Sequence, residues 1–306
     1  MVDILCKPPS TLRFGSLPGL LASLPKSPLS GNSKVTVDLK SLRWIEALPL
    51  AVLAALVRAH QANGGTGFIQ VPPRYEFLQR MNLFKVIGSK LPEKFRREPE
   101  EGRFVPLREV RPGQEVQEAA MEIVNTLKVD DEDSAMVLRH CVGELVDNVG
   151  VHAMAKTPAI ICAQHFPNAK RTQVAIVDAG IGFRKSFQAS AVYQSLGLSD
   201  RDALKLGVAP YVTSKPIVSG DPYASGYGRL GVGLFIVSEI LLRVGGKLLL
   251  ASGEATLRRT PAGQRWRVVS PWQGAVVGFE VPDSPLMSYR DATAEARRLA
   301  KERRNV

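Results

Sequence analysis

The chain has 306 residues, and its 45% hydrophobic and 23% charged residues are typical of a globular protein, which excludes the disordered and fibrous classes. Three cysteines and four histidines, scattered along the chain, are too few for a disulfide framework or a structural zinc site. The net charge of +11 would suit nucleic acid, but the basic residues are spread out or interleaved with acids, and we identify no recognition motif that combines aromatic and basic residues. Composition therefore argues against a nucleic-acid partner, which stays the last of three hypotheses.

The first residues, MVDILCKPPSTLRF, lack the basic start and sustained apolar run of a signal peptide. The longest apolar run, residues 47–57, contains Pro49 and is about half as long as a membrane-spanning helix. We therefore expect a cytoplasmic protein that does not enter a membrane.

From Lys34 onward the pattern alternates between strand and helix. The predicted elements are a strand at 34–39, a helix at 46–63, a strand at 67–71 and a helix at 74–82. Residues 89–112 are rich in Lys, Arg, Glu and Pro and lack periodicity. We interpret them as a charged linker that follows a first domain of residues 1–88.

After the linker, helices come first and strands later. The predicted elements are helices at 113–128, 132–153 and 230–244, strands at 159–164 and 172–180, and strand-like runs at 247–251, 265–270 and 275–281. This order is typical of an α+β sandwich with one sheet and a layer of helices. The second domain is expected to span 113–284, with a charged tail, helical or loose, at 285–306.

Three polar residues in the helix at 132–153 need an explanation. Glu144, Asn148 and His152 are spaced by four, so they form a stripe beside the apolar face of the helix. Polar groups that are partly buried cost free energy unless they have partners. The stripe therefore faces either loop backbone or a ligand.

The segment VAIVDAGIGF, residues 174–183, ends an apolar strand with Asp178. Gly180 and Gly182 follow and allow a close approach of the backbone. An ionised Asp only accepts hydrogen bonds, so it suits a ligand with an amino group, such as adenine. The alternative is an Asp that caps a helix.

The segment GYGRLGVGLFIVSEIL, residues 226–241, places glycines before an apolar helix. Free backbone N–H groups at a helix N-terminus bind phosphate. A dinucleotide-binding fold requires a strand directly before these glycines, and residues 214–225 predict a loop. We therefore favour a phosphate site of another kind.

Taken in order, the three segments resemble the nucleotide-binding boxes of the GHKL superfamily, which contains gyrase, mismatch-repair and heat-shock chaperone ATPases, sensor histidine kinases and bacterial anti-sigma serine kinases. The N box would be 144–152, the first glycine box 178–182 and the second 228–234, and the resemblance covers about 113–282. It implies a Bergerat-type α/β sandwich, of α+β class, with ATP and Mg²⁺ as cofactors.

The resemblance also implies roles for individual residues. Asn148 would offer its side-chain oxygen to Mg²⁺, and Asp178 would bind the adenine amino group beside Gly180 and Gly182. Glu144 stands where the hydrolysing members place a general base.

The phosphate side of the site follows from the same resemblance. Residues 183–229 would form a lid, and the amides from Gly228 through Gly231 to Gly233 would hold the triphosphate. Lys215 and Arg229 are candidates for neutralising phosphate charge.

Two departures from the superfamily pattern limit which members of the superfamily the chain is expected to resemble in function. Ala275 stands where a phosphate-contacting Thr is usual. No helical hairpin with a phosphoacceptor histidine precedes residue 113, because His140 lies within the N-box helix itself. A sensor histidine kinase is therefore not expected.

The first block resembles a shortened STAS domain, the fold of anti-sigma-factor antagonists, over VTVDLKSLRWIEALPLAVLAALVRAHQANGGTGFIQVPPRYEFLQRMNL. Leu48 occupies the position at which phosphorylated members carry a serine. The resemblance therefore implies a docking or regulatory role for this block.

The leading hypothesis is a bacterial signal-transduction protein that binds Mg·ATP and acts as a serine/threonine kinase of the anti-sigma, partner-switching type, or as an ATPase. Its partner or substrate would be a protein similar to an anti-sigma antagonist or a sigma factor, and a homodimer is an open option. The alternatives are a non-catalytic, ATP-gated protein-binding module and a nucleic-acid-binding protein that uses its basic charge.

Overall fold

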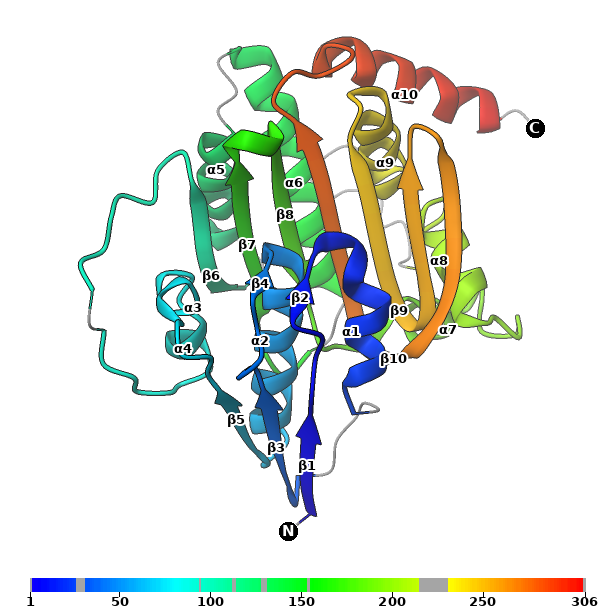
Figure 1. Ribbon diagram of the computed structural model, residues 1–306. Coiled ribbons are helices and arrows are strands. Elements are labelled where there is room, and N and C mark those ends of the chain that lie inside the picture. Colours follow the sequence, from blue (N-terminus) through cyan, green and yellow to red (C-terminus); the bar gives the residue numbers. More distant parts are fainter. Residues whose placement is uncertain are drawn as a thin grey trace.

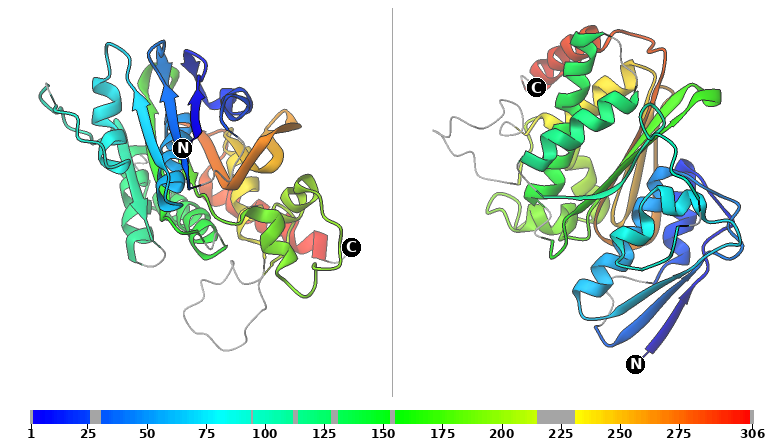
Figure 2. Two further views of the ribbon diagram at one scale, coloured as in Figure 1. Left: turned by 90° about the horizontal axis from the view of Figure 1, so that it is seen from below. Right: turned by 90° about the vertical axis from the view of Figure 1, so that its left-hand side faces the viewer.

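The computed structural model describes residues 2–25, 31–93, 95–111, 114–127, 131–152, 155–214 and 231–304. A five-stranded antiparallel sheet forms the middle layer, with helices on one face and an N-terminal unit on the other (Figures 1 and 2). The strands are β6 (Phe104–Val110), β7 (Ala159–Phe166), β8 (Arg171–Val177), β9 (Lys247–Thr260) and β10 (Gly263–Pro282), in the order β6-β7-β8-β10-β9. The predicted α+β class is confirmed.

The central strands are apolar on both sides because both faces of the sheet are covered. Ile161 of β7 and Ile176 of β8 face the helices, whereas the neighbouring Cys162 and Ala175 face the N-terminal unit. The helices on the first face are α5 (Gln114–Leu127), α6 (Glu132–His152) and α9 (Gly233–Arg243). All three occur where the sequence predicts them.

Two sequence-based expectations about strands need correction. Residues 104–110, assigned to the charged linker, form the edge strand β6, in which the apolar Phe104, Val105, Leu107 and Val110 are buried. Pro106 lies at a register shift between Val105 and Arg108, a position in a sheet where proline is tolerated. The three runs expected after residue 247 are two long strands, β9 and β10, that form one hairpin with register shifts between Val268 and Val276.

The N-terminal unit contains a parallel three-stranded sheet of β1 (Val2–Cys6), β3 (Ser33–Asp38) and β5 (Thr66–Gln70). The long helix α2 (Ala47–Ala62) packs between this sheet and the five-stranded one (Figure 2). The predicted strands at 34–39 and 67–71 and the helix at 46–63 are confirmed. The smaller elements are β2 (Thr11–Leu12), η1 (Phe14–Ser16), α1 (Leu17–Ser23), β4 (Trp44–Ile45), α3 (Glu76–Arg80) and α4 (Leu83–Val86).

The N-terminal unit and the five-stranded sheet share one apolar core. Leu48 and Leu53 of α2 belong to the same buried cluster as Cys162, Ala175 and Val276 of the sheet. The block of residues 1–88 therefore does not bury a core that is independent of residues 113–284.

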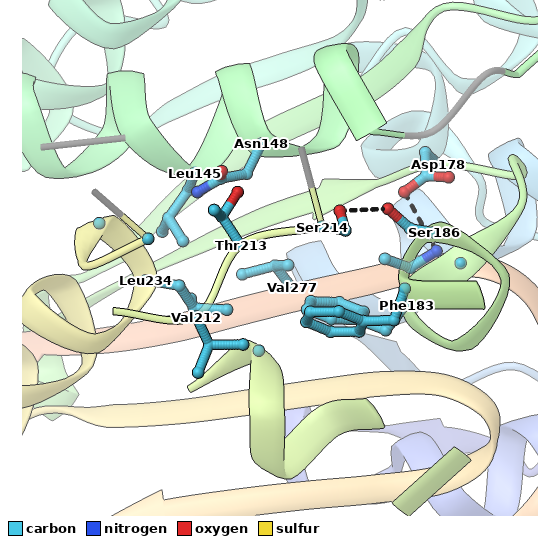
Figure 3. Close-up of a pocket in the computed structure, with 16 residues that line it drawn as sticks. Leu145, Asn148, Asp178, Phe183, Ser186, Val212, Thr213, Ser214, Leu234 and Val277 are labelled. Atoms are coloured by element: carbon cyan, nitrogen blue, oxygen red, sulfur yellow. Dashed lines mark hydrogen bonds between the residues drawn. The ribbon is translucent and has the colours of Figure 1, made fainter. Parts of the chain in front are cut away.

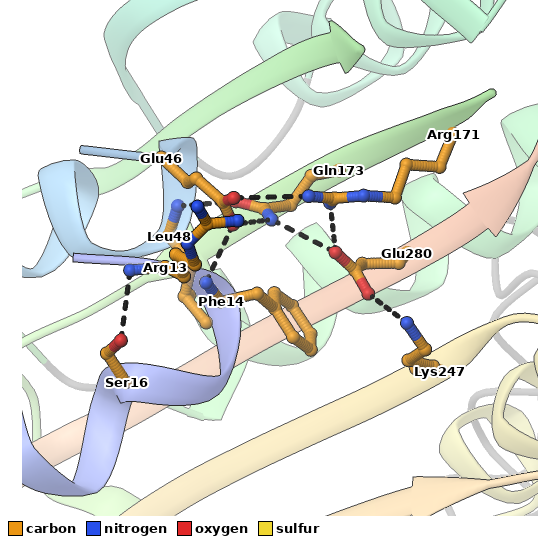
Figure 4. A network of polar contacts seen from close by, with 9 residues as sticks. All are labelled: Arg13, Phe14, Ser16, Glu46, Leu48, Arg171, Gln173, Lys247 and Glu280. Carbon is orange, nitrogen blue, oxygen red and sulfur yellow. Dashed lines mark hydrogen bonds and ion pairs between the residues drawn. The ribbon is translucent and has the colours of Figure 1, made fainter. Parts of the chain in front are cut away.

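A buried polar network connects the N-terminal unit to the five-stranded sheet (Figure 4). Glu46, 1% exposed, accepts hydrogen bonds from the Phe14 N–H at 2.7 Å and the Gln173 side chain at 2.9 Å, and it pairs with Arg171 at 3.1 Å. The Gln173 Oε1 in turn accepts the Leu48 N–H at 3.1 Å, so a side chain of β8 caps the first turn of α2. The hydrogen bonds lower the pKa of Glu46 despite its burial.

The residues assigned to a charged tail form α10 (Tyr289–Arg304), which packs across α6 and α9. Its Ala292, Ala296 and Ala300 are buried, at spacings of four that place them on one face. Within the part of the chain that the structure describes, none of the helices has the length and apolar character needed to span a bilayer.

Candidate functional site

A pocket opens at the end of the five-stranded sheet where β8 stops and the last part of β10 begins (Figure 3). The polar predicted residues Asn148 and Asp178 lie on its walls, together with Gly182, Gly231 and Gly233. Segments far apart in the sequence, from α6 to α9, thus meet at one place. Lys215, Gly228 and Arg229 lie outside the described residues.

Asp178 is held rigidly at one end of the pocket. It is 3% exposed, and its two carboxylate oxygens accept the Gly180 N–H at 2.7 Å and the Ala275 N–H at 3.0 Å. Gly180 therefore contacts the Asp178 carboxylate through its own backbone N–H. Burial raises the pKa of Asp178 to about 7, although both amide hydrogen bonds favour the charged form.

The alternative role of Asp178 as a helix cap does not fit the geometry. The next helix, α7 (Gly182–Gln188), has Ile181 as its N-cap, and the Phe183 N–H of its first turn donates to the Ser252 hydroxyl at 3.1 Å and not to Asp178. Gly182 has a φ of 73°, and a Cβ there would lie 2.6 Å from the Ser252 Oγ and 2.8 Å from the Gly274 carbonyl oxygen. Glycine is therefore required where the chain turns beneath the pocket.

Helix α6 contributes Leu145 and Asn148 to the pocket lining. Glu144 is 6% exposed, and its Oε1 lies 4.0 Å from His140 Nε2. Burial and the nearby Arg297 of α10 lower the pKa of His140. Glu144 is not among the described residues that line the pocket, although Leu145 and Asn148 of the same helix are.

The other end of the pocket is the N-terminus of α9. Its N-cap, Val232, provides no side-chain hydrogen bond, so the first amides of α9 rely on other partners. Gly231 has a φ of 67°, and its carbonyl accepts the Val212 N–H at 3.2 Å. A Cβ at Gly231 would lie 2.4 Å from the Val212 carbonyl oxygen, so residues 212–214 pack directly on the second glycine box.

This contact places in the pocket hydroxyl groups that were not predicted from the sequence. Thr213 and Ser214 line the cavity, and the Thr213 side chain points toward Asn148 (Figure 3). The Ser214 and Ser186 hydroxyls are hydrogen-bonded at 2.8 Å. The only signal in the sequence was the pair of hydroxyl residues before Lys215, within the segment expected to form the lid.

The middle of the pocket is apolar. The side chains of Leu145, Phe183, Val212, Leu234 and Val277 project into it (Figure 3). A flat heteroaromatic ring fits such a lining, with Asp178 as a hydrogen-bond acceptor at its edge.

The position of Ala275 corrects the expectation that its side chain replaces a phosphate contact. Its amide donates to Asp178, and its carbonyl accepts the Asp178 N–H at 2.9 Å. Ala275 therefore lies at the Asp178 end of the pocket, away from the glycines that precede α9.

No group of three or more His, Cys, Asp or Glu side chains that could hold a metal occurs among the described residues. Mg²⁺ keeps several waters and binds through substrate phosphates and one or two protein oxygens. The side-chain oxygen of Asn148 is of this chemical type, and the Thr213 side chain points toward Asn148 (Figure 3).

Residues 133–284 match the family model described as histidine kinase-, DNA gyrase B-, and HSP90-like ATPase. A comparison with curated proteins and a comparison with solved structures gave no match. The matched residues include every described part of the pocket.

Proposed function

Because residues 133–284 form a domain of the histidine kinase-, DNA gyrase B-, and HSP90-like ATPase family, we propose that the chain binds Mg·ATP in this pocket and transfers the terminal phosphate to a serine or threonine of a partner protein, or to water. The observation that carries the proposal is the placement of Asp178 and the N-terminus of α9 at opposite ends of one apolar pocket, with Asn148 between them.

Each group has a role that follows from its chemistry. The Asp178 carboxylate accepts a hydrogen bond from the adenine amino group, and the apolar side chains around Phe183 exclude water from the base. The first amides of α9 bind the phosphates, aided by the positive end of the helix. Asn148 would hold the metal, and bound Mg²⁺ would neutralise charge that develops on the phosphates.

Glu144 is the proposed general base. One turn before Asn148 on α6, its carboxylate would orient the attacking hydroxyl or water and accept its proton. Because Glu144 does not line the pocket, this role requires the side chain to turn toward the bound phosphates.

Calorimetry with ATP and ADP, with and without Mg²⁺, tests the proposal. Asn148→Ala and Asp178→Ala should abolish binding, whereas Glu144→Ala should keep binding and lose turnover. Wild-type protein that binds neither nucleotide at millimolar concentration would refute the proposal, and unchanged turnover in Glu144→Ala would refute the catalytic role alone.

The burial of Glu144 supports a second candidate, a non-catalytic module in which nucleotide binding changes the surface offered to a partner. Radiolabel transfer and phosphate release from purified protein distinguish the two. Binding without either product would favour the module.

We also propose that the N-terminal unit, which resembles a STAS domain, is a docking element and not a phosphorylation target in the same chain. Leu48, at the acceptor position, is fully buried, and its N–H is bonded to Gln173 on the face of the sheet that the N-terminal unit covers. A protein substrate would therefore be a separate molecule, and mass spectrometry after incubation with ATP should find no phosphate in residues 1–88.

A further inference from the structure

The β9–β10 hairpin carries a row of arginines that lies outside the nucleotide pocket. Arg258 of β9 lies directly across from Arg265 of β10, and Arg267 follows two residues later on the same face. All three side chains are exposed. Among the carboxylates that the structure describes, none lies within ion-pair distance of them.

Like charges directly across a strand pair destabilise it. Neutral or acidic residues at these exposed positions would satisfy the fold equally well, because none of the three side chains packs in the core. An anion held between Arg258 and Arg265 would remove the repulsion. The row therefore has the features of a surface for a ligand with repeated negative charge.

The other face of the hairpin adds cations around an aromatic ring. The half-buried Trp266 lines a pocket with Lys205 of α8 (Asp200–Gly207), Arg259 and Arg303. The guanidinium of Arg201 lies over the Trp266 ring, 5.2 Å from its centroid. Figure 1 shows how α8 and the C-terminal end of α10 flank this hairpin.

The charge of this face is only partly balanced. Lys205 pairs with Asp202, and Arg259 pairs with Glu239. Arg201 and Arg303 have aromatic rings as their partners, so their charges remain in excess.

We propose that these residues, named here the basic hairpin (Arg201, Lys205, Arg258, Arg259, Arg265, Trp266, Arg267 and Arg303), bind the backbone of single-stranded nucleic acid, with a base stacked at Trp266. Such sites combine cations that follow the phosphates with an aromatic ring that stacks an unstacked base. Here the arginine row and Trp266 lie on opposite faces of the hairpin, so a bound strand would pass around the edge strand β9 to reach both. A duplex keeps its bases stacked and would use the arginines alone. An acidic protein would not need Trp266.

This inference is independent of the proposed nucleotide chemistry. It also corrects the interpretation of the basic residues in the sequence. Arg258, Arg259, Arg265, Trp266 and Arg267 lie within ten residues of one another, a basic and aromatic cluster that sequence reasoning missed, and the fold adds Arg201, Lys205 and Arg303 to it.

Fluorescence anisotropy of a labelled oligothymidylate of about 16 nucleotides tests the proposal, with salt varied from about 50 to 200 mM. The test variant is Arg258→Ala/Arg265→Ala/Arg267→Ala, whose exposed positions should not affect folding. The control variant is Lys40→Ala/Arg43→Ala/Arg74→Ala, which removes the same charge from exposed positions of the N-terminal part of the chain.

Wild type and the control should bind alike, and binding should weaken with salt. The test variant should bind more weakly, with a log–log salt slope smaller by about 2, because each lost phosphate contact on a single strand accounts for about 0.7. Trp266→Leu should weaken binding of the single strand and leave binding of a duplex of equal length unchanged.

Three results would overturn the inference. Wild type that does not bind the oligonucleotide at the lowest salt has no such site. An equal loss in the control variant would mean that only net charge matters. Competition by polyglutamate as strong as that by the oligonucleotide would identify an acidic protein as the partner.

Discussion

Under the proposed function, the raised pKa of Asp178 predicts that nucleotide recognition depends on pH. With a pKa of about 7, roughly a tenth of the carboxyl groups are ionised at pH 6 and roughly nine tenths at pH 8. Only the ionised form is purely a hydrogen-bond acceptor for the adenine amino group. The affinity for adenosine should therefore rise about tenfold between pH 6 and pH 8, which corresponds to about 1.4 kcal/mol.

Adenosine is the suitable probe because it has no phosphate that titrates in this range. Calorimetry at pH 6 in two buffers of different ionisation enthalpy should also detect the release of close to one proton per adenosine bound. The control is Asp202→Asn, a carboxylate of α8 whose side chain is 47% exposed, which should keep the wild-type pH profile. Asp178→Asn should not bind measurably at either pH.

The same pKa fixes the sign of a stability effect without ligand. The folded protein holds the Asp178 proton more tightly than the unfolded chain does. The stabilisation of the folded state by this proton is therefore complete below about pH 4 and is lost as the pH rises through about 7. The difference between the pKa of Asp178 in the folded and the unfolded state corresponds to about 4 kcal/mol in the free energy of unfolding. Equal adenosine affinity at pH 6 and pH 8, with no proton release, would refute the reasoning for both effects.

Further substitutions test other parts of the structure. Glu46→Ala leaves buried polar partners unpaired and should lower the free energy of unfolding by about 3–5 kcal/mol in urea titrations. The exposed Glu302→Ala should leave the unfolding midpoint nearly unchanged. Equal effects of the two substitutions would contradict the role of Glu46 in holding the N-terminal unit on the sheet. Because the pKa of Glu46 is lowered, its contribution should be present above about pH 4.3 and decline as the pH falls through the folded pKa. Ala275→Ser places a hydroxyl beside Asp178 and should move the pH profile of adenosine binding to lower pH, and an unchanged profile would contradict the placement of Ala275. Ala296→Asp buries a carboxylate in the contact of α10 with the domain and should lower stability by several kcal/mol, whereas a neutral effect would mean that α10 is not fixed there.

The sequence predicted the ATPase-like domain well because its elements have clear periodicity. Helices α5, α6 and α9 and strands β7 and β8 appear within a few residues of their predicted bounds. Edge strand β6 was missed because Pro106 and the charged Arg108 and Glu109 hide its alternation. The charged residues of β6 form ion pairs with neighbouring helices: Arg108 pairs with Glu122 of α5, and Glu109 pairs with Arg58 of α2.

The N-terminal unit shows a different limit. Its local elements were predictable, but its role as the cover of the second sheet face was not, because that role depends on side chains more than 100 residues apart. Glu46, for example, meets Gln173 and Arg171 only in the folded chain. A pattern of strand and helix alone suggests a separate domain, whereas the shared core makes the unit part of one folded body.

The nucleotide pocket and the basic hairpin meet at α8, which no periodicity argument could have revealed. Gly207 lines the pocket at one end of the helix, and Lys205, two residues earlier, borders Trp266. A Cβ at Gly207 would lie 2.4 Å from the Phe183 ring, so α8 packs tightly against a side chain that lines the nucleotide pocket. Movement of Phe183 on nucleotide binding would change this contact with α8, and ligands at the two sites would be coupled to the extent that each prefers one position of this helix.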